Sequence, residues 1–429
     1  MYFLRLSALK PILTEIAESE WSNYFLGSSR ARSVPRVLDV RQGEVCWVIG
    51  TIYLDMPLKP NVLDDLAKDH SLAAPPTRER FCEPGVDRVM LEDESGRLIL
   101  TGIGLENEDL VTGVVMAVLG LENSEGEFQV LDIRSPDLAP MRKVEAESEE
   151  KGRVAVTSGL GIYGDLQEKL GLHLLSEWLL GEAGGEEDQA EAATISRLII
   201  AGNSLGTSQN PIAEMLTDDA KTQRAKKYGY DAKAYNPVPI THLDSFLSTL
   251  LPSIPITLLP GPTDPANVSY PQQPLHSALF RTAKTYDTTT LTRATNPWSG
   301  TIGTHTFLVT SGQNLDDIFR YLDTDTTQRR LDMCEKMLRW RIVAPTAPDT
   351  LWSYPMRETD PFVMTETPRW FIVGNQKEFA VRTVESADGS VRCTVVLVPP
   401  FEETGVVLVV DLGSGELGLM RFAAEVEGV

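Results

Sequence analysis

The sequence predicts a multidomain α+β fold, in which a small β-barrel precedes a layered α/β domain. Residues 34–135 alternate short apolar runs with turn residues, a pattern typical of small barrels. After a polar stretch at 144–152, strand-like runs alternate with helical patterns, which indicates an α/β domain. The 429 residues also exceed the usual length of one domain. We therefore expect a helical segment at 1–33, a barrel domain at 34–150 and an α/β domain at 151–429.

The first 135 residues contain one helix and five or six strands. Residues 2–20 have helical periodicity, and Pro11 is expected to kink or divide this helix. The Asp93–Gly96 segment has the composition of a hairpin turn. The expected strands are Val37–Val40, Val45–Tyr53, Arg88–Glu92, Arg97–Ile103, Leu110–Leu119 and Glu127–Ile133.

Strands of this number and length suit an OB-fold barrel. An OB-fold that binds single strands has a basic groove with aromatic platforms. Residues 34–145 instead contain 11 basic and 21 acidic residues. Large aromatic side chains usually lie in the core, and we expect this for Trp47, Tyr53, Phe81 and Phe128. The charge favours a protein-binding barrel, with a single-strand-binding module as an alternative.

The second domain is predicted from alternating helical and strand-like segments. Asp165–Leu180 and Thr326–Trp340 have helical patterns, and Thr241–Asp244 resembles a helix capping box. The segment Glu378–Phe422 returns to strands, with a hairpin turn at Asp388-Gly389.

Charge and apolar content restrict the function. The chain has 39 basic and 61 acidic residues, a formal net charge of −22, so DNA should repel it as a whole. The longest apolar stretches, such as Val114–Leu121, are too short to span a membrane. Charged Arg5 and Lys10 in the first helix argue against a secretory signal. Four cysteines without paired spacing are expected to be reduced core thiols: Cys46, Cys82, Cys334 and Cys393.

Four apolar runs of the second domain end in turns with few metal-ligating side chains. The runs are Arg153–Ser158, Arg197–Ala201, Ile256–Pro260 and Trp370–Val373. Enzymes of the α/β class place their chemistry at the carboxyl ends of parallel strands. These turns hold mainly Gly, Asn, Pro and Thr, and the carboxylate of Asp264 is of the kind that often caps backbone amides. An enzyme-like scaffold without such ligands indicates a protein that binds partners.

Two short motifs suggest enzymes, but their surroundings do not. Gly159–Gly164 matches the dinucleotide pattern G-x-G-x-x-G, yet the next strand ends in Gly202-Asn203 instead of an acidic residue for the ribose. Gly202–Gly206 matches the nucleophile elbow G-x-S-x-G, with Asp264 downstream. The following Thr207–Pro211 is polar and ends in proline rather than opening a helix. Ser204 is therefore expected in an ordinary turn.

The histidines do not predict a metal site. A two-metal phosphoesterase needs several His and Asp ligands near the strand ends. The five histidines are far apart in sequence: His70, His173, His242, His276 and His305. We expect no catalytic residue, no bound metal and no cofactor.

One insert has a different composition. Residues 217–239 interleave lysines with tyrosines, and Lys226, Lys227 and Tyr228 are the densest group. A solvated loop is the ordinary interpretation, and a weak nucleic-acid contact is the alternative.

Several segments together resemble the B-subunit family of replicative DNA polymerases, in particular its delta members. The most specific are LLPGPTDPANVSYPQQPLHSALF (258–280) and IVAPTAPDTLWSYPMRETDPF (342–362). Residues 2–13, 37–56 and 307–321 are also similar, so the resemblance covers nearly the whole chain. Family members usually continue upstream of this helix, so Met1 is expected to be a trimmed start.

The resemblance implies an OB-fold packed against an inactivated calcineurin-like phosphodiesterase domain. Active relatives carry metal ligands in five motifs, and the matching positions here have lost nearly all of them. These positions are Gly159, Gly161, Asn203, Pro262, Thr263, Asp264, Thr346, Asn375 and Lys377.

The resemblance also implies a function. Such a chain is a non-catalytic scaffold subunit of DNA polymerase delta in the nucleus. It bridges the cysteine-rich C-terminal domain of the catalytic subunit and a third accessory subunit, with DNA contacted weakly or indirectly. An active metallophosphoesterase and an OB-fold single-strand binder remain the alternatives.

Overall fold

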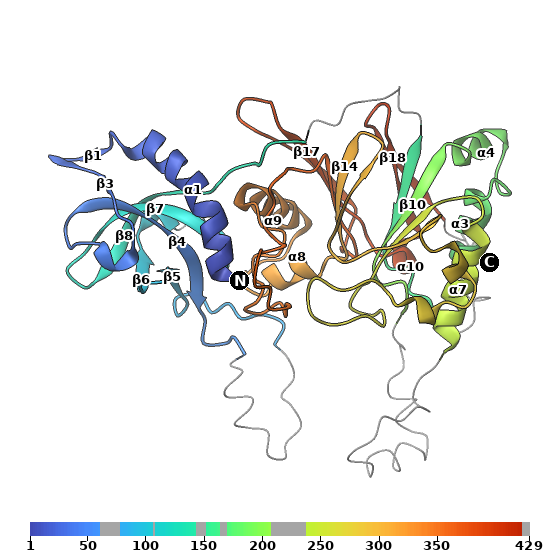
Figure 1. Ribbon diagram of the computed structural model, residues 1–429, viewed down its shortest axis with the longest axis horizontal. Coiled ribbons are helices and arrows are strands. Elements are labelled where there is room, and N and C mark those ends of the chain that lie inside the picture. Colours follow the sequence, from blue (N-terminus) through green and yellow to red (C-terminus); the bar gives the residue numbers. More distant parts are fainter. Residues whose placement is uncertain (61–77, 106–107, 143–151, 164–169, 207–236, 423–429) are drawn as a thin grey trace, which may run out of the picture.

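The computed structural model describes residues 1–60, 78–105, 108–142, 152–163, 170–206 and 237–422. Figure 1 shows an elongated molecule with a barrel and helix α1 (Tyr2–Trp21) at one end. The second domain follows in layers, and helices α8 (Gln313–Ile318) and α9 (Thr327–Trp340) lie next to the barrel (Figure 1). Two sheets come next, and then helices α3 (Leu170–Leu179), α4 (Glu186–Ala192) and α7 (Val238–Leu250). The predicted multidomain α+β organisation is confirmed.

The first domain is a closed five-stranded barrel, with the short strand β3 added beside β4. Its strands lie in the order β3-β4-β5-β6-β8-β7, and pairing of β4 with β7 closes the sheet. Trp47, Phe81 and Phe128 are buried as expected, whereas Tyr53 is half-buried between the cations of Lys59 and Arg97. The strands are β3 (Arg32–Ser33), β4 (Val45–Asp55), β5 (Arg88–Glu92), β6 (Arg97–Thr101), β7 (Val115–Glu122) and β8 (Glu127–Arg134).

Helix α1 covers the barrel. Leu9, Leu13, Ala17 and Trp21 form its buried stripe against the barrel core. Pro11 lies on the exposed side, and the helix runs through it without division. Burial of the stripe therefore outweighs the cost of an interior proline. A hairpin of β1 (Phe25–Leu26) and β2 (Ser29–Arg30) follows.

Two of the predicted barrel strands were wrong in detail. Val37–Val40 is not a strand, because its first residues form a 3-10 helix, Val37–Asp39. Its backbone amides bind side chains of the turn at 93–96 instead of a neighbouring strand. The Asp93 carboxylate accepts from Val37 N–H, and Ser95 Oγ accepts from Leu38 N–H. The strand predicted at Leu110–Leu119 begins only at Val115.

The second domain contains two sheets. The first sheet has the order β12-β11-β10-β9-β18-β19, with β9 to β12 parallel and β18 and β19 antiparallel additions. Its strands are β9 (Arg153–Thr157), β10 (Ile195–Ala201), β11 (Ile256–Leu259), β12 (Leu291–Arg293), β18 (Val406–Asp411) and β19 (Leu417–Arg421).

The second sheet has the order β13-β14-β15-β17-β16, with parallel pairing among β14, β15 and β17. The fourth predicted run, Trp370–Val373, therefore belongs to a different sheet from the other three. The strands are β13 (Trp298–Ile302), β14 (His305–Thr310), β15 (Trp370–Val373), β16 (Ala380–Glu385) and β17 (Arg392–Leu397).

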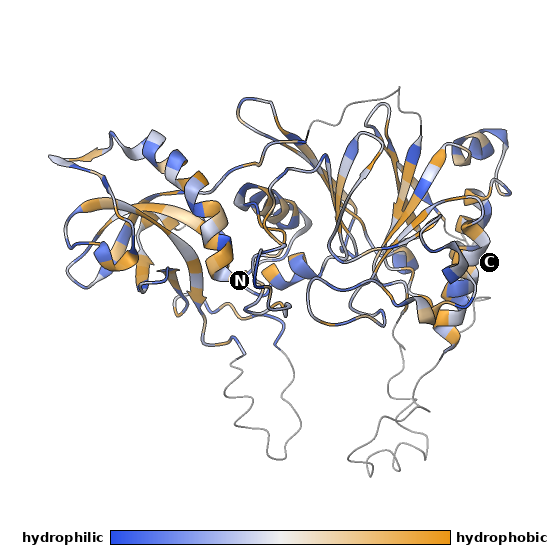
Figure 2. Ribbon diagram, in the orientation of Figure 1, coloured by the Kyte–Doolittle hydropathy of each residue, from blue (hydrophilic) through white to orange (hydrophobic). Residues whose placement is uncertain are grey.

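The central strands of both sheets are buried on both faces. In β9, Val154 and Val156 face the core between the sheets, whereas Ala155 faces the core below the helices. In β15, Trp370 joins the core between the sheets, and Phe371 joins the core shared with the barrel. Figure 2 accordingly shows mostly hydrophobic central strands and a largely hydrophilic α4. The domain is thus a helix–sheet–sheet–helix stack.

The helices are α3 (Leu170–Leu179), α4 (Glu186–Ala192), α7 (Val238–Leu250), α8 (Gln313–Ile318), α9 (Thr327–Trp340) and α10 (Phe401–Thr404). Thr326 caps α9 as its N-cap residue. The capping box at Thr241–Asp244 was wrong, because α7 already begins at Val238. Asp244 instead accepts backbone N–H groups from residues 281–283 and so ties the helix to that loop. Residues 165–169 of the predicted helix lie outside the described part.

The buried guanidinium of Arg5 joins the two domains. From α1 it donates to Gly113 O of the barrel (2.9 Å) and to Pro345 O of the second domain (2.8 Å). It also donates to Ala347 O (3.1 Å) and forms an ion pair with Asp360 (2.8 Å). The charges of Arg5 and Asp360 are almost fully buried, so each depends on the other for neutralisation.

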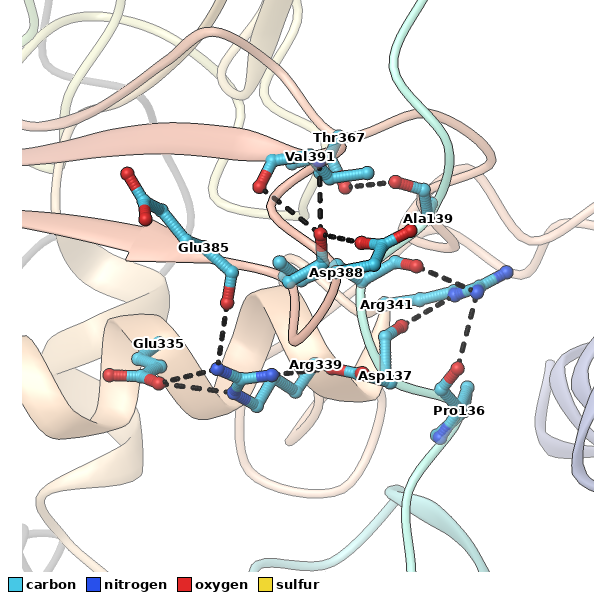
Figure 3. Close-up of polar contacts among 12 residues, drawn as sticks. Pro136, Asp137, Ala139, Glu335, Arg339, Arg341, Thr367, Glu385, Asp388 and Val391 are labelled. Atoms are coloured by element: carbon cyan, nitrogen blue, oxygen red, sulfur yellow. Dashed lines mark hydrogen bonds and ion pairs between the residues drawn. The ribbon is translucent and has the colours of Figure 1, made fainter. Parts of the chain in front are cut away.

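The segment that leaves the barrel is also bound by the second domain. Arg341, at the end of α9, donates to the carbonyl oxygens of Pro136, Asp137 and Leu138 (Figure 3). Thr367 Oγ1 donates to Ala139 O at 2.6 Å. Backbone carbonyls of an extended segment are thereby satisfied by side chains, and this fixes the path between the domains.

The cysteine and membrane predictions can be checked in the described residues. All four cysteines are free thiols, and Cys46, Cys334 and Cys393 are buried, while Cys82 is half-buried. None of the helices that the structure describes is long and apolar enough to span a membrane.

We predict that Arg5→Met lowers the free energy of unfolding by about 3–5 kcal/mol, because it leaves Asp360 buried without a counter-ion. Urea unfolding measures this loss. Arg36→Met, which removes the exposed pair with Asp39, is the control and should change the midpoint little. The double variant Arg5→Met/Asp360→Leu should recover part of the loss. An unfolding midpoint unchanged by Arg5→Met would contradict the role of Arg5 in joining the two domains.

Candidate functional site

The ends of strands from both sheets meet at one edge of the second domain. Asn375 follows β15 of the second sheet, and its N–H donates to Ser158 Oγ at the end of β9 (2.9 Å). Its Nδ2 donates to Ala201 O at the end of β10 (3.2 Å) and to Ser311 O after β14 (2.8 Å). The side chain of Asn375 therefore links the two sheets at this edge.

Asn203 has a matching role after β10. Its Oδ1 accepts hydrogen bonds from Thr263 N (3.3 Å) and Thr263 Oγ1 (3.0 Å) in the turn after β11. Asn203 and Asn375 have φ values of 54° and 55°, in the left-handed region that asparagine tolerates better than most residues. Each asparagine thus serves as a turn residue and as a cross-link.

Asp264 is a structural cap in this arrangement. Its carboxylate accepts backbone N–H groups from Gly261 (2.8 Å), Leu205 (2.9 Å) and Ser204 (3.3 Å). Burial raises the pKa of Asp264 to about 6, although these hydrogen bonds favour the charged form. Its oxygens are occupied by amides from two successive strand ends, which leaves little capacity for a cation.

The glycines after β9 are required by close packing. Gly159 has φ +60°, and a Cβ there would lie 2.7 Å from both Asn375 Oδ1 and Pro400 Cβ. Gly161 has φ +56°, and its Cβ would overlap the carboxylate of Glu402. Both positions combine a left-handed backbone with lack of space, so side chains that could bind metal do not fit.

Three of the positions that the resemblance matches to metal ligands take no part in these hydrogen bonds at the strand ends: Pro262, Thr346 and Lys377. Thr346 is buried and donates to Asp317 Oδ2 (2.5 Å), next to α8. Lys377 pairs with Asp325 (2.7 Å) before α9. Pro262 is exposed in the turn after β11. Lys226, Lys227 and Tyr228 lie outside the described residues.

Sequence reasoning missed Arg330, whose buried charge supports this edge. From α9 its guanidinium donates to Gln376 Oε1 (2.6 Å), to Asp316 (2.7 Å) and to both carboxylate oxygens of Asp325. The pairs with Arg330 and Lys377 lower the pKa of Asp325 to about 2. The available signal was a basic residue amid the apolar stripe of α9. Asp325 lies just before the helix, but Asp316 is 14 residues away and Gln376 is 46 residues away.

The arrangement has few groups for catalysis. No cluster of three or more His, Cys, Asp or Glu side chains that could hold a metal occurs among the described residues. Ser204 is fully buried, so it is not placed as an exposed nucleophile. His276 is exposed and caps a 3-10 turn, and His305 Nδ1 accepts from Trp370 Nε1. What this edge does chemically is to hold turns together through the amides of Asn203 and Asn375 and the carboxylate of Asp264.

Comparisons with known proteins agree with the fold. The family model for the B-subunit of DNA polymerases alpha and epsilon matches residues 154–381, and the model for the OB-fold domain of the DNA polymerase delta subunit matches residues 1–133. The class is therefore that of polymerase B-subunits, with an OB-fold in the first domain.

Curated relatives identify the branch of this class. The chain is 34% identical to the DNA polymerase delta small subunit of Arabidopsis thaliana, over 99% of this chain and 91% of that protein. It is 32% identical to the small subunit of Saccharomyces cerevisiae (96% and 86%) and 34% identical to subunit 2 of Drosophila melanogaster (100% and 93%). The chain belongs to the family of DNA polymerase delta small subunits, the accessory subunits of that polymerase.

We predict that Gly159→Ala lowers the free energy of unfolding by about 3 kcal/mol, because it adds a clash to left-handed backbone strain. Gly389→Ala is the matched control. Gly389 has φ +70°, but a Cβ added there would meet nothing within 4 Å, so only the backbone cost of about 1 kcal/mol applies. Chemical denaturation measures both variants, and equal losses would refute the packing argument.

We also predict that Asp264 makes the free energy of unfolding depend on pH. Its folded pKa of about 6 exceeds the ordinary value of 3.8, so between pH 7 and 5 the folded state takes up a proton that the unfolded state does not. The free energy of unfolding should therefore gain about 1 kcal/mol from this group as the pH falls from 7 to 5. Asp264→Asn should remove this gain in urea titrations at both pH values. The same slope in both proteins would assign it to other carboxyl groups.

Proposed function

We propose that this chain is a non-catalytic scaffold of DNA polymerase delta and that its second domain is an inactivated calcineurin-like phosphodiesterase. The observation that carries the proposal is the strand-end edge, where Asn203, Asn375 and Asp264 bind neighbouring backbone groups. The positions equivalent to metal ligands in active relatives would then be Gly159, Gly161, Asn203, Pro262, Thr263, Asp264, Thr346, Asn375 and Lys377. The helix–sheet–sheet–helix stack supports this assignment.

In this proposal the scaffold binds the cysteine-rich C-terminal domain of the catalytic subunit and a third accessory subunit, within the nucleus. The relatives are named as small subunits of DNA polymerase delta, which supports a role inside a larger enzyme. One hydrophobic core includes buried residues of both domains, and Arg5 bonds to both of them. These contacts favour a scaffold in which the two domains keep a fixed relative position. Stable subunit interfaces need large surfaces of fixed geometry, and a rigid two-domain body can provide one.

The alternative functions have less support. An active metallophosphoesterase needs several metal ligands at the edge, where the described residues offer glycines, asparagines and one carboxylate, Asp264, that already caps backbone amides. A single-strand-binding barrel needs a basic groove, but residues 34–145 carry 21 acidic and 11 basic side chains.

The first test is enzymatic. The purified chain with added Mn²⁺ should not hydrolyse bis(p-nitrophenyl) phosphate above a buffer control, because the edge lacks ligands for two metal ions. An active calcineurin-like enzyme assayed in parallel controls for the conditions. Metal-dependent turnover that disappears in Asp264→Ala would overturn the assignment as inactive.

The second test divides the chain near Glu149. We predict that fragments 1–149 and 150–429 each bind the C-terminal domain of the catalytic subunit more weakly than the intact chain, because separation breaks the Arg5 contacts between domains. Co-expression followed by size-exclusion chromatography compares the three proteins. Full affinity in residues 34–145 alone would contradict the two-domain scaffold.

A further inference from the structure

A groove runs between helices α3 and α7, at the end of the molecule opposite the barrel (Figure 1). Its volume of about 420 Å³ lies within the range of about 300–1,000 Å³ that is usual for binding pockets. Leu170, Leu172, Leu180 and Phe246 contribute to a lining that is mostly apolar. We call this feature the α3–α7 groove.

Helix α3 presents side chains on two of its faces. One face is buried in the core between this helix and the first sheet. A second stripe, at steps of three and four residues, lines the α3–α7 groove. The groove therefore follows the helix for about 15 Å, because an α-helix rises 1.5 Å per residue. The stripe consists of Leu170, His173, Glu177 and Leu180.

The charged side chains around the groove are acidic. Glu177 and Glu182 line it, and no Lys or Arg does so in the part of the chain that the structure describes. Glu182 is exposed and forms no ion pair with another described residue. His173 Nε2 lies 3.1 Å from Glu177 Oε1, but a neutral imidazole leaves the charge of Glu177 in place. Helix α4, which follows α3, adds three acidic residues in its first turn, so the local field is negative.

We propose that the α3–α7 groove binds an amphipathic helix of another protein, with an apolar stripe flanked by Lys or Arg. A groove that follows a helix for about three turns suits an elongated occupant with an apolar side chain in each turn. The acidic side chains attract Lys and Arg, whereas they repel the phosphates of nucleic acids and of anionic lipids. This inference goes beyond the proposed function and does not depend on it.

The first arm of the test measures charge preference. Fluorescence anisotropy of the labelled peptide LKKLLKLLKKLLKL, titrated with the full-length chain, measures binding of a helix with leucines on one face and lysines on the other. The peptide LEELLELLEELLEL keeps the leucines and reverses the charge. We expect the glutamate peptide to bind about tenfold or more weakly than the lysine peptide. Equal binding of the two peptides, or no binding of the lysine peptide, would overturn the proposal.

The second arm tests the apolar lining. Leu170 is 49% exposed, and Leu38 on the barrel, which is 70% exposed, provides the matched control. We expect Leu170→Ser to bind the lysine peptide about fivefold or more weakly and Leu38→Ser to bind it like the wild type. Thermal unfolding of both variants should stay close to that of the wild type, because both side chains are exposed. Unchanged affinity of Leu170→Ser would contradict the proposal.

The third arm separates the local charge from the charge of the whole chain. Glu177→Gln/Glu182→Gln and the control Glu15→Gln/Glu18→Gln remove the same two negative charges, the first pair from the groove and the second from exposed positions on α1. We expect only the groove pair to weaken binding of the lysine peptide, by about fivefold, and to reduce its dependence on salt. Equal effects of the two pairs would assign binding to the field of the whole chain and overturn the proposal.

Two further results would show a different occupant and likewise overturn the proposal. Self-association of the wild type that Leu170→Ser abolishes in sedimentation experiments would assign the groove to a second copy of this chain. Binding of the lysine peptide that becomes much tighter after deletion of residues 207–236, which precede α7 in the sequence, would assign it to this chain's own insert. We expect neither result.

Discussion

The guanidinium of Arg5 is the contact on which the arrangement of the two domains depends. A buried charge is stable only when its hydrogen bonds and counter-ion are present together. For Arg5 they come from the carboxylate of Asp360, from Gly113 of the barrel and from two carbonyls of loop 345–360. Correct docking is therefore coupled to neutralisation of a charge, and a misplaced domain would leave it unsatisfied.

The edge of the two sheets is also held by polar groups that bind one another. Asn375 crosses from the second sheet to Ser158 and Ala201 of the first, and Asp264 binds amides from two turns. In an active metallophosphoesterase a cation could join such strand ends. Here hydrogen bonds and close glycine contacts join them.

Much of the fold could be predicted from sequence, but some elements could not. Periodicity located α1 and α9, and apolar runs located β4, β9, β10 and β15. The strand expected at Val37–Val40 failed because Asp93 and Ser95, more than fifty residues away, bind its amides. The capping box at Thr241 failed because Asp244 binds a loop near residue 282. Pro11 did not divide α1, because the buried stripe on its other side holds the helix.

The sequence by itself determined the local features: strand and helix periodicity, the scarcity of metal-ligating residue types at the turns, and the formal net charge of −22. These depend on residue type and on near neighbours, which the chain order displays directly. Only the tertiary structure decided that two sheets share one edge, that Arg5 joins the domains, and that Arg330 supports Gln376. Each of these depends on partners from distant segments, because a buried charge or amide is stabilised by whichever groups the packing brings within hydrogen-bonding distance.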